Sequence, residues 1–530
     1  MARLDTVDVG SLCVRCFPDA LPRSVPRRRG VTGGAALLVL TFATWCVPAA
    51  VVRAQTTPVP VGGPPITAVG GTPATGVPDT SPVTIAPVQA GPSTSPPPTA
   101  APTSSSAAPP STSTSPSTAD LVGATTVPAD PALMAPVGTS VPAAGSTTTV
   151  APAASTPDQL RRQVLAALAT GGAGRSAVIV IDGSTMIDLN GTDLRPPAST
   201  QKVYTAGTAL VQLGPDHRFI TSVRAGAVAV GSVVTGDLIL VAGGDPSLTA
   251  SGLTRLAADV AGTGVRSVTG RLLVDDTHFD RALFNEGWKR SFLPGEVGPL
   301  SAFLVDGNHR SDRATLADPA MANLALFRAA LVKAGVTVAG GMDRGTIGAG
   351  GPVLATRRSA PLSDLIDHMV KKSDNTYAEV VLKEMGVASG APTAAGGVAA
   401  ITRQFDRFGV PRPVMADGSG LSSINRTTAE QQVAWMTKMD ASAGGRGLRR
   451  SLPIACVDGT LRSRMCGTAA SGKVTAKTGY IDNVATLTGY TQTARGRRVV
   501  FSILFSGVPS SAKARAAIDR AMAAVTAYTG

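Results

Sequence analysis

The pattern of apolar and polar positions divides the chain at about residue 157. Residues 55–157 consist almost wholly of Pro, Thr, Ser, Ala, Gly and Val, and show neither helical nor strand-like periodicity. A segment of this composition cannot bury enough surface to offset the conformational entropy that folding removes. We therefore expect residues 55–157 to form a disordered, Pro-stiffened tether, and residues 158–530 to form the folded part.

The two ends of the folded part have related patterns. After a helix with apolar residues at helical spacing, short apolar runs predict strands at 176–181 and 186–189. Near the other end, similar runs predict strands at 484–490 and 498–505, followed by a helix over 511–528. We expect both ends to pair in one antiparallel sheet flanked by helices, which is an α/β (α+β) fold.

Between these ends, residues 219–306 have a different character. Apolar runs at 228–234, 238–241 and 271–274 are separated by Gly-rich turns. We interpret 219–306 as an inserted, β-rich subdomain.

The N-terminus has the layout of an export signal. Residues 1–34 contain several Arg residues and would be a cytoplasmic leader, and an apolar run of roughly 15 residues follows within 35–54. This run is shorter than the roughly 20 residues that a transmembrane helix needs, and Val52-Arg53-Ala54 suits cleavage. A cleaved signal peptide and an uncleaved signal anchor both remain open. Either one places the folded part outside the cytoplasm, secreted to the cell envelope or wall, or membrane-anchored.

Composition and charge exclude several classes of protein. The net charge is +13, but the basic residues are scattered and aromatic residues make up only 4%, so we expect no nucleic-acid partner. A single long apolar run excludes a polytopic membrane protein. His217, His278, His309 and His368 lack the spacing of metal ligands, and we predict neither a metal nor another cofactor.

Candidate chemistry begins with an S-x-x-K sequence, Ser199-Thr200-Gln201-Lys202, that opens an apolar helix. Residues three apart share a helix face, so the Ser199 hydroxyl and the Lys202 amine should meet. A serine at a helix N-terminus lies beside free backbone N–H groups, which suits a nucleophile next to an oxyanion hole. Ser510 to Lys513 fits the same pattern, and we interpret it as the start of a surface helix.

Two further motifs follow in the chain. Ser373-Asp374-Asn375 lies between two predicted helices, where a turn can present a hydroxyl and an amide to a cleft. Lys477-Thr478-Gly479 follows a predicted strand at 473–476. An edge strand there could pair with an extended peptide, and its glycine would allow close backbone approach.

Ordered S-x-x-K, S-x-N and K-T-G motifs resemble those of penicillin-binding proteins and serine β-lactamases. The finer resemblance is to the D-alanyl-D-alanine carboxypeptidase/endopeptidase family, the class C low-molecular-mass penicillin-binding proteins. It rests also on Gly243-Gly244-Asp245-Pro246, on residues 416–422, and on the separation of 174 positions from Ser199 to Ser373. It covers residues 158–530 and implies a penicillin-binding-protein/β-lactamase-like transpeptidase fold with an insert.

The resemblance also implies roles for the motif residues. Ser199 would attack the penultimate D-Ala carbonyl, Lys202 would accept the proton, and Ser373 would relay a proton to the leaving amine. The backbone N–H groups of Ser199 and Tyr480 would form the oxyanion hole. The implied catalytic residues are Ser199, Lys202 and Ser373, and the implied substrate-binding residues are Asn375, Lys477, Thr478, Gly479 and Tyr480.

The implied substrates are peptidoglycan stem peptides, with β-lactam antibiotics as acylating inhibitors. Carboxypeptidase and endopeptidase activity both remain open, as does selectivity for the third peptide residue, because Lys289 follows Gly287-Trp288 where relatives can carry an acid. The alternatives are a serine β-lactamase or a non-catalytic cell-wall-binding protein. The string most similar to a deacylating E-x-x-L-N is 379–383, which ends in Lys383.

Cys456 and Cys466 are the only cysteines of the predicted folded part. Because the export signal leads to an oxidising compartment, we expect them to form a disulfide. The alternative is a pair of buried free thiols.

Overall fold

The computed structural model describes residues 155–346 and 351–530. The expected leader, the signal segment and almost all of the tether lie outside the described residues. No described helix combines the length and apolar character needed to cross a membrane.

The main sheet is antiparallel and joins both ends of the folded part, as expected. Its strand order is β11-β12-β13-β1-β2, and β1 pairs with β13 from Arg175 opposite Phe505 to Ile181 opposite Val499. Strand β11 therefore lies at one edge, with β12 as its partner. The strands are β1 Arg175–Ile181, β2 Ser184–Leu189, β11 Thr475–Ile481, β12 Val484–Gln492 and β13 Arg498–Phe505.

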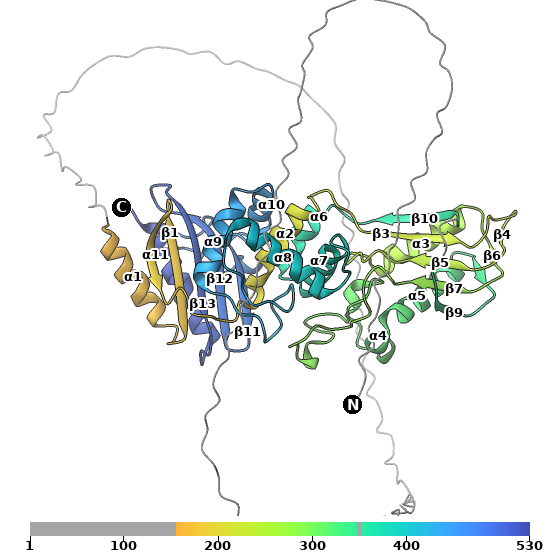
Figure 1. Ribbon diagram of the computed structural model, residues 1–530, viewed down its shortest axis with the longest axis horizontal. Helices are drawn as coiled ribbons and strands as arrows, with labels where there is room; N and C mark the ends of the chain where they lie inside the picture. The colour runs from red at the N-terminus through yellow and green to blue at the C-terminus, as the bar shows by residue number, and fades with distance from the viewer. Residues whose placement is uncertain (1–154, 347–350) are drawn as a thin grey trace, which may run out of the picture. The chain divides into compact units, whose positions relative to one another are not determined.

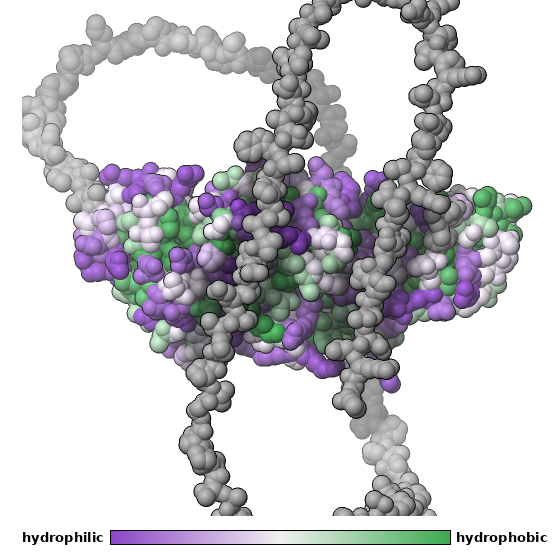
Figure 2. Space-filling model, viewed as in Figure 1, coloured by the Kyte–Doolittle hydropathy of each residue, from purple (hydrophilic) through white to green (hydrophobic). Residues whose placement is uncertain are grey.

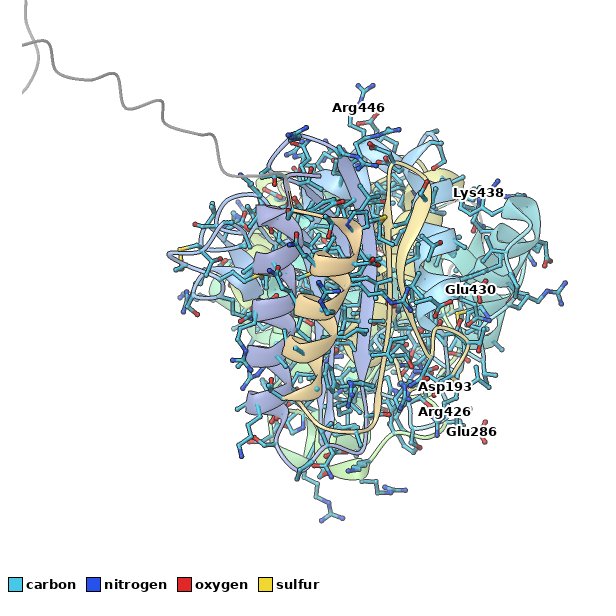
Figure 3. All side chains as sticks on the ribbon, turned by 90° about the vertical axis from the view of Figure 1, so that its left-hand side faces the viewer. Asp193, Glu286, Arg426, Glu430, Lys438 and Arg446 are labelled. Atoms are coloured by element: carbon cyan, nitrogen blue, oxygen red, sulfur yellow. A yellow bond between two sulfur atoms is a disulfide. The ribbon has the colours of Figure 1, made fainter. Side chains whose placement is uncertain are left out.

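Helices α1 (Pro157–Ala169) and α11 (Ser511–Ala527) lie side by side on one face of this sheet (Figures 1 and 3). Thr156 begins α1 with a capping box, and the helix buries residues at spacings of four. These side chains pack with the inward-facing residues of β1, β12 and β13 in one apolar core.

The other face of the sheet is covered by α9 (Ala429–Asp440), behind which further helices pack. The centre of this second core is aromatic: the Tyr204 ring lies 4.9 Å from Phe405 and 5.2 Å from Trp435, both edge to face. The helices that share this core are α2 Lys202–Gln212, α6 Leu362–Lys372, α7 Asn375–Val387, α8 Ala394–Phe408 and α10 Gly445–Ser451.

The insert contains a second five-stranded sheet of order β10-β3-β5-β7-β9, in which β5, β7 and β9 are parallel. The predicted end of the insert near residue 306 is wrong, because the sheet continues to Arg358. Strand β9 has three residues and β10 is largely exposed, so neither shows an apolar run. The strands are β3 Ile220–Ala225, β5 Leu238–Val241, β7 Leu272–Asp275, β9 Met342–Arg344 and β10 Val353–Arg358.

A small sheet of order β4-β6-β8 completes the insert. The predicted strand at 228–234 is reduced to β4, because Val228 and Val230 are 73% and 79% exposed and the chain turns at Gly231. Figure 2 shows apolar surface at this end of the insert. The remaining elements are β4 Val233–Val234, β6 Ser267–Val268, β8 Thr337–Val338, α3 Ala250–Gly262, α4 Arg313–Ala317, α5 Pro319–Lys333 and the 3₁₀ turns Arg290–Phe292 and Asp306–Asn308.

Candidate active site

Ser199 lies in a 3₁₀ turn, η1 (Ala198–Gln201), that continues directly into α2. Ala198, immediately before it, has a φ of +46°, a left-handed conformation that is strained for a residue with a side chain. The single turn from Ser199 to Lys202 brings the lysine Nζ to 3.1 Å from the serine Oγ. The two side chains therefore meet as the S-x-x-K spacing predicts.

The Lys202 amine is fully buried, and all three of its hydrogen-bond acceptors are uncharged oxygens. Besides Ser199, it donates to Asn375 Oδ1 and to the Ser419 carbonyl, both at 2.7 Å. Burial lowers the pKa of Lys202 to about 8, although Asp417 and Glu379 oppose this shift. A usable fraction of Lys202 is therefore an uncharged amine at neutral pH, which a general base requires.

Ser373 and Lys477 form a second hydroxyl–amine pair. Helix α6 ends at Lys372, and Ser373 takes a left-handed conformation with a φ of +61° in the turn before α7. Lys477 Nζ donates to Ser373 Oγ at 2.9 Å and to the Thr478 carbonyl at 2.8 Å. Burial, assisted by the charge of Lys202, holds the pKa of Lys477 well below its usual value.

Gly479 lets edge strand β11 approach the turn that carries Ser199. A Cβ atom at Gly479 would lie 2.8 Å from the Pro197 carbonyl oxygen and 3.1 Å from the Ala198 Cβ. Any side chain there would push the two segments apart. The strand begins later than predicted, at Thr475 rather than Lys473, and includes the whole K-T-G motif.

These elements enclose a cleft of about 390 Å³. Lys202 and Lys477 lie buried beside it, and Tyr480 at its rim is 57% exposed. Two larger cavities, of about 610 and 600 Å³, flank α10 and contain none of the motif residues. The predicted residues that line the cleft are Ser199, Ser373, Asn375, Thr478 and Tyr480, and the others are Phe292, Glu296, Lys372, Leu421, Thr460, Ile481 and Asp482.

The insert contributes two residues to this cleft that sequence reasoning missed. Phe292 and Glu296 line it, and the Glu296 carbonyl accepts a hydrogen bond from Asn375 Nδ2 at 2.8 Å. Trp288 Nε1 donates to Asp417 at 2.9 Å. In the sequence, the Gly-Trp pair at 287–288 was the one feature that could have indicated that this part of the insert lies near the cleft.

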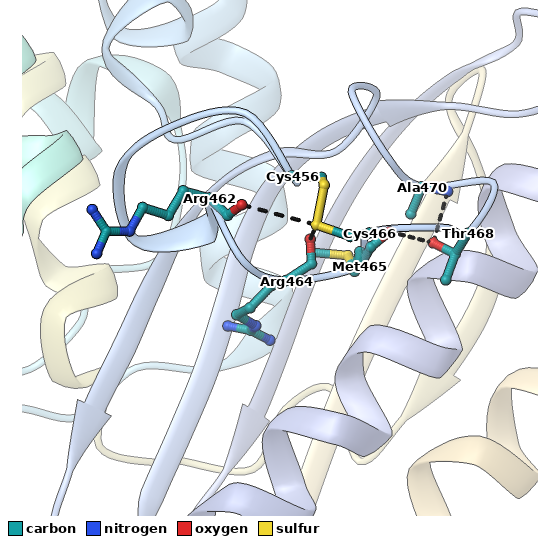
Figure 4. The surroundings of a disulfide bond; sticks show 7 residues. All are labelled: Cys456, Arg462, Arg464, Met465, Cys466, Thr468 and Ala470. Carbon is teal, nitrogen blue, oxygen red and sulfur yellow. Dashed lines mark hydrogen bonds between the residues drawn. A yellow bond between two sulfur atoms is a disulfide. The ribbon is translucent and has the colours of Figure 1, made fainter.

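The predicted disulfide between Cys456 and Cys466 is confirmed, with 5.0 Å between the two Cα atoms (Figure 4). It closes a loop that contains the 3₁₀ turn η4 (Gly459–Leu461). Thr460 from this turn lines the cleft and accepts a hydrogen bond from Thr478 Oγ1 at 2.8 Å. The disulfide therefore braces one wall of the cleft.

Within residues 155–346 and 351–530, no group of three or more His, Cys, Asp and Glu side chains is arranged to hold a metal ion. Two histidines instead contact one buried carboxylate: His217 Nε2 and His278 Nε2 lie 3.1 Å and 2.7 Å from the oxygens of Glu384. His368 Nε2 lies 3.2 Å from Asp374.

Comparisons with known proteins agree with this geometry. The chain matches the D-Ala-D-Ala carboxypeptidase 3 (S13) family over residues 159–313 and 301–529. It is 31% identical to the D-alanyl-D-alanine carboxypeptidase of Actinomadura sp. (strain R39) over 418 residues, covering 63% of this chain and 78% of that protein. It is also 31% identical to carboxypeptidase DacB of Mycolicibacterium smegmatis over 367 residues, covering 63% and 75%.

Among solved structures, penicillin binding protein 4 of Haemophilus influenzae matches with a TM-score of 0.62 and 23% identity. The match covers 68% of this chain and 97% of that one, and it shows that the two share a fold. The expected penicillin-binding-protein-like fold is thus confirmed. Because the family match spans almost all of the described residues, the chain belongs to the D-Ala-D-Ala carboxypeptidase 3 (S13) family.

Proposed function

We propose that Ser199 is the nucleophile with which this serine D-Ala-D-Ala carboxypeptidase cleaves peptidoglycan stem peptides outside the cytoplasm. The observation that carries the proposal is the position of the buried Lys202 amine, 3.1 Å from Ser199 Oγ at the cleft. A serine hydroxyl needs an adjacent base to become a competent nucleophile, and a desolvated lysine can act as one.

The reaction proceeds in two halves. Ser199 Oγ attacks the carbonyl carbon of the penultimate D-Ala while its proton passes to Lys202, and the N–H groups of Ser199 and Tyr480 stabilise the resulting oxyanion. The carbon–nitrogen bond then breaks as Ser373, assisted by Lys477, delivers its proton to the departing amine and takes up in its place the proton that Lys202 had accepted. Water attacks the ester that remains, and its proton passes through Lys202 to Ser199 Oγ as the ester bond breaks, which restores Ser199 and releases the shortened peptide.

The edge strand β11 and the side chains around it hold the substrate in this scheme. An extended peptide adds alongside the second half of β11, beyond Ala476, because the outer edge of its first residues already pairs with 453–455. Thr478 and Lys477 bind its terminal carboxylate. Asn375 donates to a substrate amide with the Nδ2 hydrogen that does not bond to the Glu296 carbonyl. Gly479 keeps this strand close to Ser199.

A β-lactam ring presents the same kind of acyl group to Ser199, so the enzyme is acylated by penicillins. Penicillin binding protein 4 of Haemophilus influenzae has also been solved in complex with a β-lactam, and that structure matches with a TM-score of 0.57. Covalent uptake of labelled penicillin therefore reports the acylation half of the reaction independently of any peptide.

Two finer points extend the proposal. The cleft accepts cross-linked as well as free stem peptides, which adds endopeptidase activity to the carboxypeptidase reaction. The N-terminal apolar run holds the enzyme at the membrane or, once cleaved, releases it into the wall, and the tether gives the enzyme reach.

Incubation of the purified full chain with a stem pentapeptide and with cross-linked muropeptides tests the function. Mass spectrometry should detect loss of one terminal D-Ala from the pentapeptide and cleavage of the cross-links. The Ser199→Ala variant should leave both substrates intact. Release of D-Ala by that variant at the wild-type rate would overturn the assignment of the nucleophile.

A further inference from the structure

Glu379 is a fully buried carboxylate that does not line the cleft, yet it lies one turn along α7 from Asn375. Three donors surround it: the Ser419 N–H at 2.7 Å, the Gly418 N–H at 3.2 Å and Asn285 Nδ2 at 2.5 Å. A buried carboxylate with so many dedicated donors has a definite structural task, because each unsatisfied partner would cost free energy.

The two backbone donors belong to the turn 417–420, and the opposite side of that turn contacts helix α2. The Gly418 carbonyl accepts from Thr205 Oγ1, and the Ser419 carbonyl accepts from Lys202 Nζ, both at 2.7 Å. The turn is thus held between Glu379 on its N–H side and the helix of the S-x-x-K motif on its carbonyl side.

Asp417 fixes the remainder of the same turn. Its carboxylate accepts from the Gly420 and Ser422 N–H groups at 2.9 Å and 2.6 Å, and from Asn425 Nδ2 at 2.7 Å. Asp417 therefore closes the turn on itself, whereas Glu379 is the carboxylate that ties the turn to α7.

We propose that Glu379 is a positioning residue for acylation: it fixes the turn 417–420, and the Ser419 carbonyl of that turn keeps the Lys202 amine beside Ser199. The proposal rests on the proposed function, because it acts through Lys202 as the base. Asn285, which belongs to the insert, shares the task by binding the second oxygen of Glu379.

The charge of Glu379 has a consequence that a purely structural residue would not have. Lys202 is faced by Asp417, Glu379, Asp374 and Glu296, which raise its pKa against burial, and its own charge acts on Lys477. Burial and the nearby Asp417 raise the pKa of Glu379 to about 8, so Glu379 ionises over the same pH range in which Lys202 loses its proton. In that range the developing negative charge of Glu379 opposes the deprotonation of Lys202, and a variant without this charge should complete that deprotonation at lower pH.

The test measures the rate of covalent acylation by labelled penicillin as a function of pH for two variants of the full chain. Glu379→Gln keeps an oxygen that accepts from the Gly418 and Ser419 N–H groups, but it has no charge. Glu379→Ala loses the acceptor as well. Glu384→Gln is the matched control, because Glu384 is a buried carboxylate on the same helix whose contacts are histidines.

We expect Glu379→Gln to acylate at high pH within about threefold of the wild type, because the hydrogen bonds from the Gly418 and Ser419 N–H groups remain and only the one from Asn285 is lost. The acid limb of its rate profile should lie at lower pH than that of the wild type and of Glu384→Gln. Glu379→Ala should acylate about 100-fold more slowly, because a base displaced by about 1 Å loses its alignment with the hydroxyl.

An acid limb of Glu379→Gln that coincides with the wild-type limb, or that moves to higher pH, would overturn the proposal. So would a folded Glu379→Ala that acylates at the wild-type rate, and if that variant does not fold, the Glu379→Gln profile decides alone. Lys202→Ala separates this failure from that of the proposed function. An unshifted Glu379→Gln beside an inactive Lys202→Ala contradicts only the positioning role, whereas an active Lys202→Ala contradicts the base.

Discussion

Buried ionisable side chains lie near both ends of helix α7, and their partners differ between the two ends. At its N-terminal end, Lys202 and Lys477 are buried beside the cleft and, among the described residues, bond to neutral oxygens rather than to carboxylates. Near its C-terminal end, Lys383 pairs with Asp280 at 2.5 Å and Glu384 lies between two histidines, which joins the helix to the insert.

The difference shows how the same residue type serves two purposes. A buried lysine with a carboxylate partner holds two segments together, and loss of one partner is costly. A buried lysine without such a partner has a lowered pKa and becomes available as a base or proton donor.

The largest effect should follow from removal of the nucleophile. Ser199→Ala should abolish covalent penicillin uptake and peptide hydrolysis, because no other hydroxyl occupies its place beside Lys202. Ser510→Ala is the matched control, since Ser510 begins the second S-x-x-K sequence but serves as the N-cap of α11. That control should keep full uptake and lose about 1 kcal/mol of stability. Gel detection of labelled protein measures the uptake, and any covalent labelling of Ser199→Ala would show that another residue is the nucleophile.

Replacement of the two kinds of buried lysine should separate activity from stability. Lys202→Ala should slow acylation by about 100- to 10,000-fold, as loss of a general base does. Its stability should stay within about 1 kcal/mol of the wild type, because relief of the desolvation of the buried amine offsets the two acceptors that are left unpaired. Lys383→Ala should keep its acylation rate but lose about 2 kcal/mol, because it leaves Asp280 without its cation; Asp280 is partly exposed, which moderates the loss. Urea denaturation measures the stability and a penicillin-uptake assay measures the acylation rate. A stable but inactive Lys383→Ala, or an active but destabilised Lys202→Ala, would contradict the assignment of the two lysines.

The sequence predicted those parts of the site that depend on local spacing. Ser199 and Lys202 meet because three residues make one helical turn, and β1 pairs with β13 because both are continuous apolar runs. The Ser419 carbonyl could not be predicted, because a backbone acceptor carries no residue signature. Strands β9 and β10 were missed because they are short or exposed, so burial does not mark them in the sequence.

The disulfide should have an intermediate effect, since it braces the cleft without taking part in the chemistry. The double variant Cys456→Ser, Cys466→Ser should lose about 3 kcal/mol of stability in the chain-entropy picture, because the unfolded chain is no longer restrained by the cross-link; the short loop keeps the loss from being larger. Acylation should slow as Thr460 loses its fixed place against Thr478. Thermal denaturation with and without reductant should show the same loss for the wild type and none for the variant. A wild-type protein insensitive to reductant would argue against this bracing role.

The smallest effect should come from Glu384, which connects α7 to His278 of the insert. Burial raises the pKa of Glu384, but the contacts with His217 and His278 outweigh it and place the pKa below its ordinary value. A depressed carboxylate pKa contributes stability above the unfolded value of about 4.3, and this is lost as the pH falls through the folded value. Glu384→Gln should therefore cost about 1–2 kcal/mol at neutral pH and show a shallower loss of stability in acid. If the free energy of unfolding fell equally steeply with decreasing pH in the variant and the wild type, Glu384 would not contribute to the acid sensitivity.

The pH dependence of acylation reports whether an uncharged Lys202 activates Ser199. The second-order rate of covalent penicillin uptake by the wild-type chain should rise with pH through an apparent pKa of about 8, and the label should map to the peptide that contains Ser199. Lys202→Ala should lose this rise together with its rate. A wild-type rate that is flat from mildly acidic to mildly alkaline pH, or a label on a different serine, would contradict the claim.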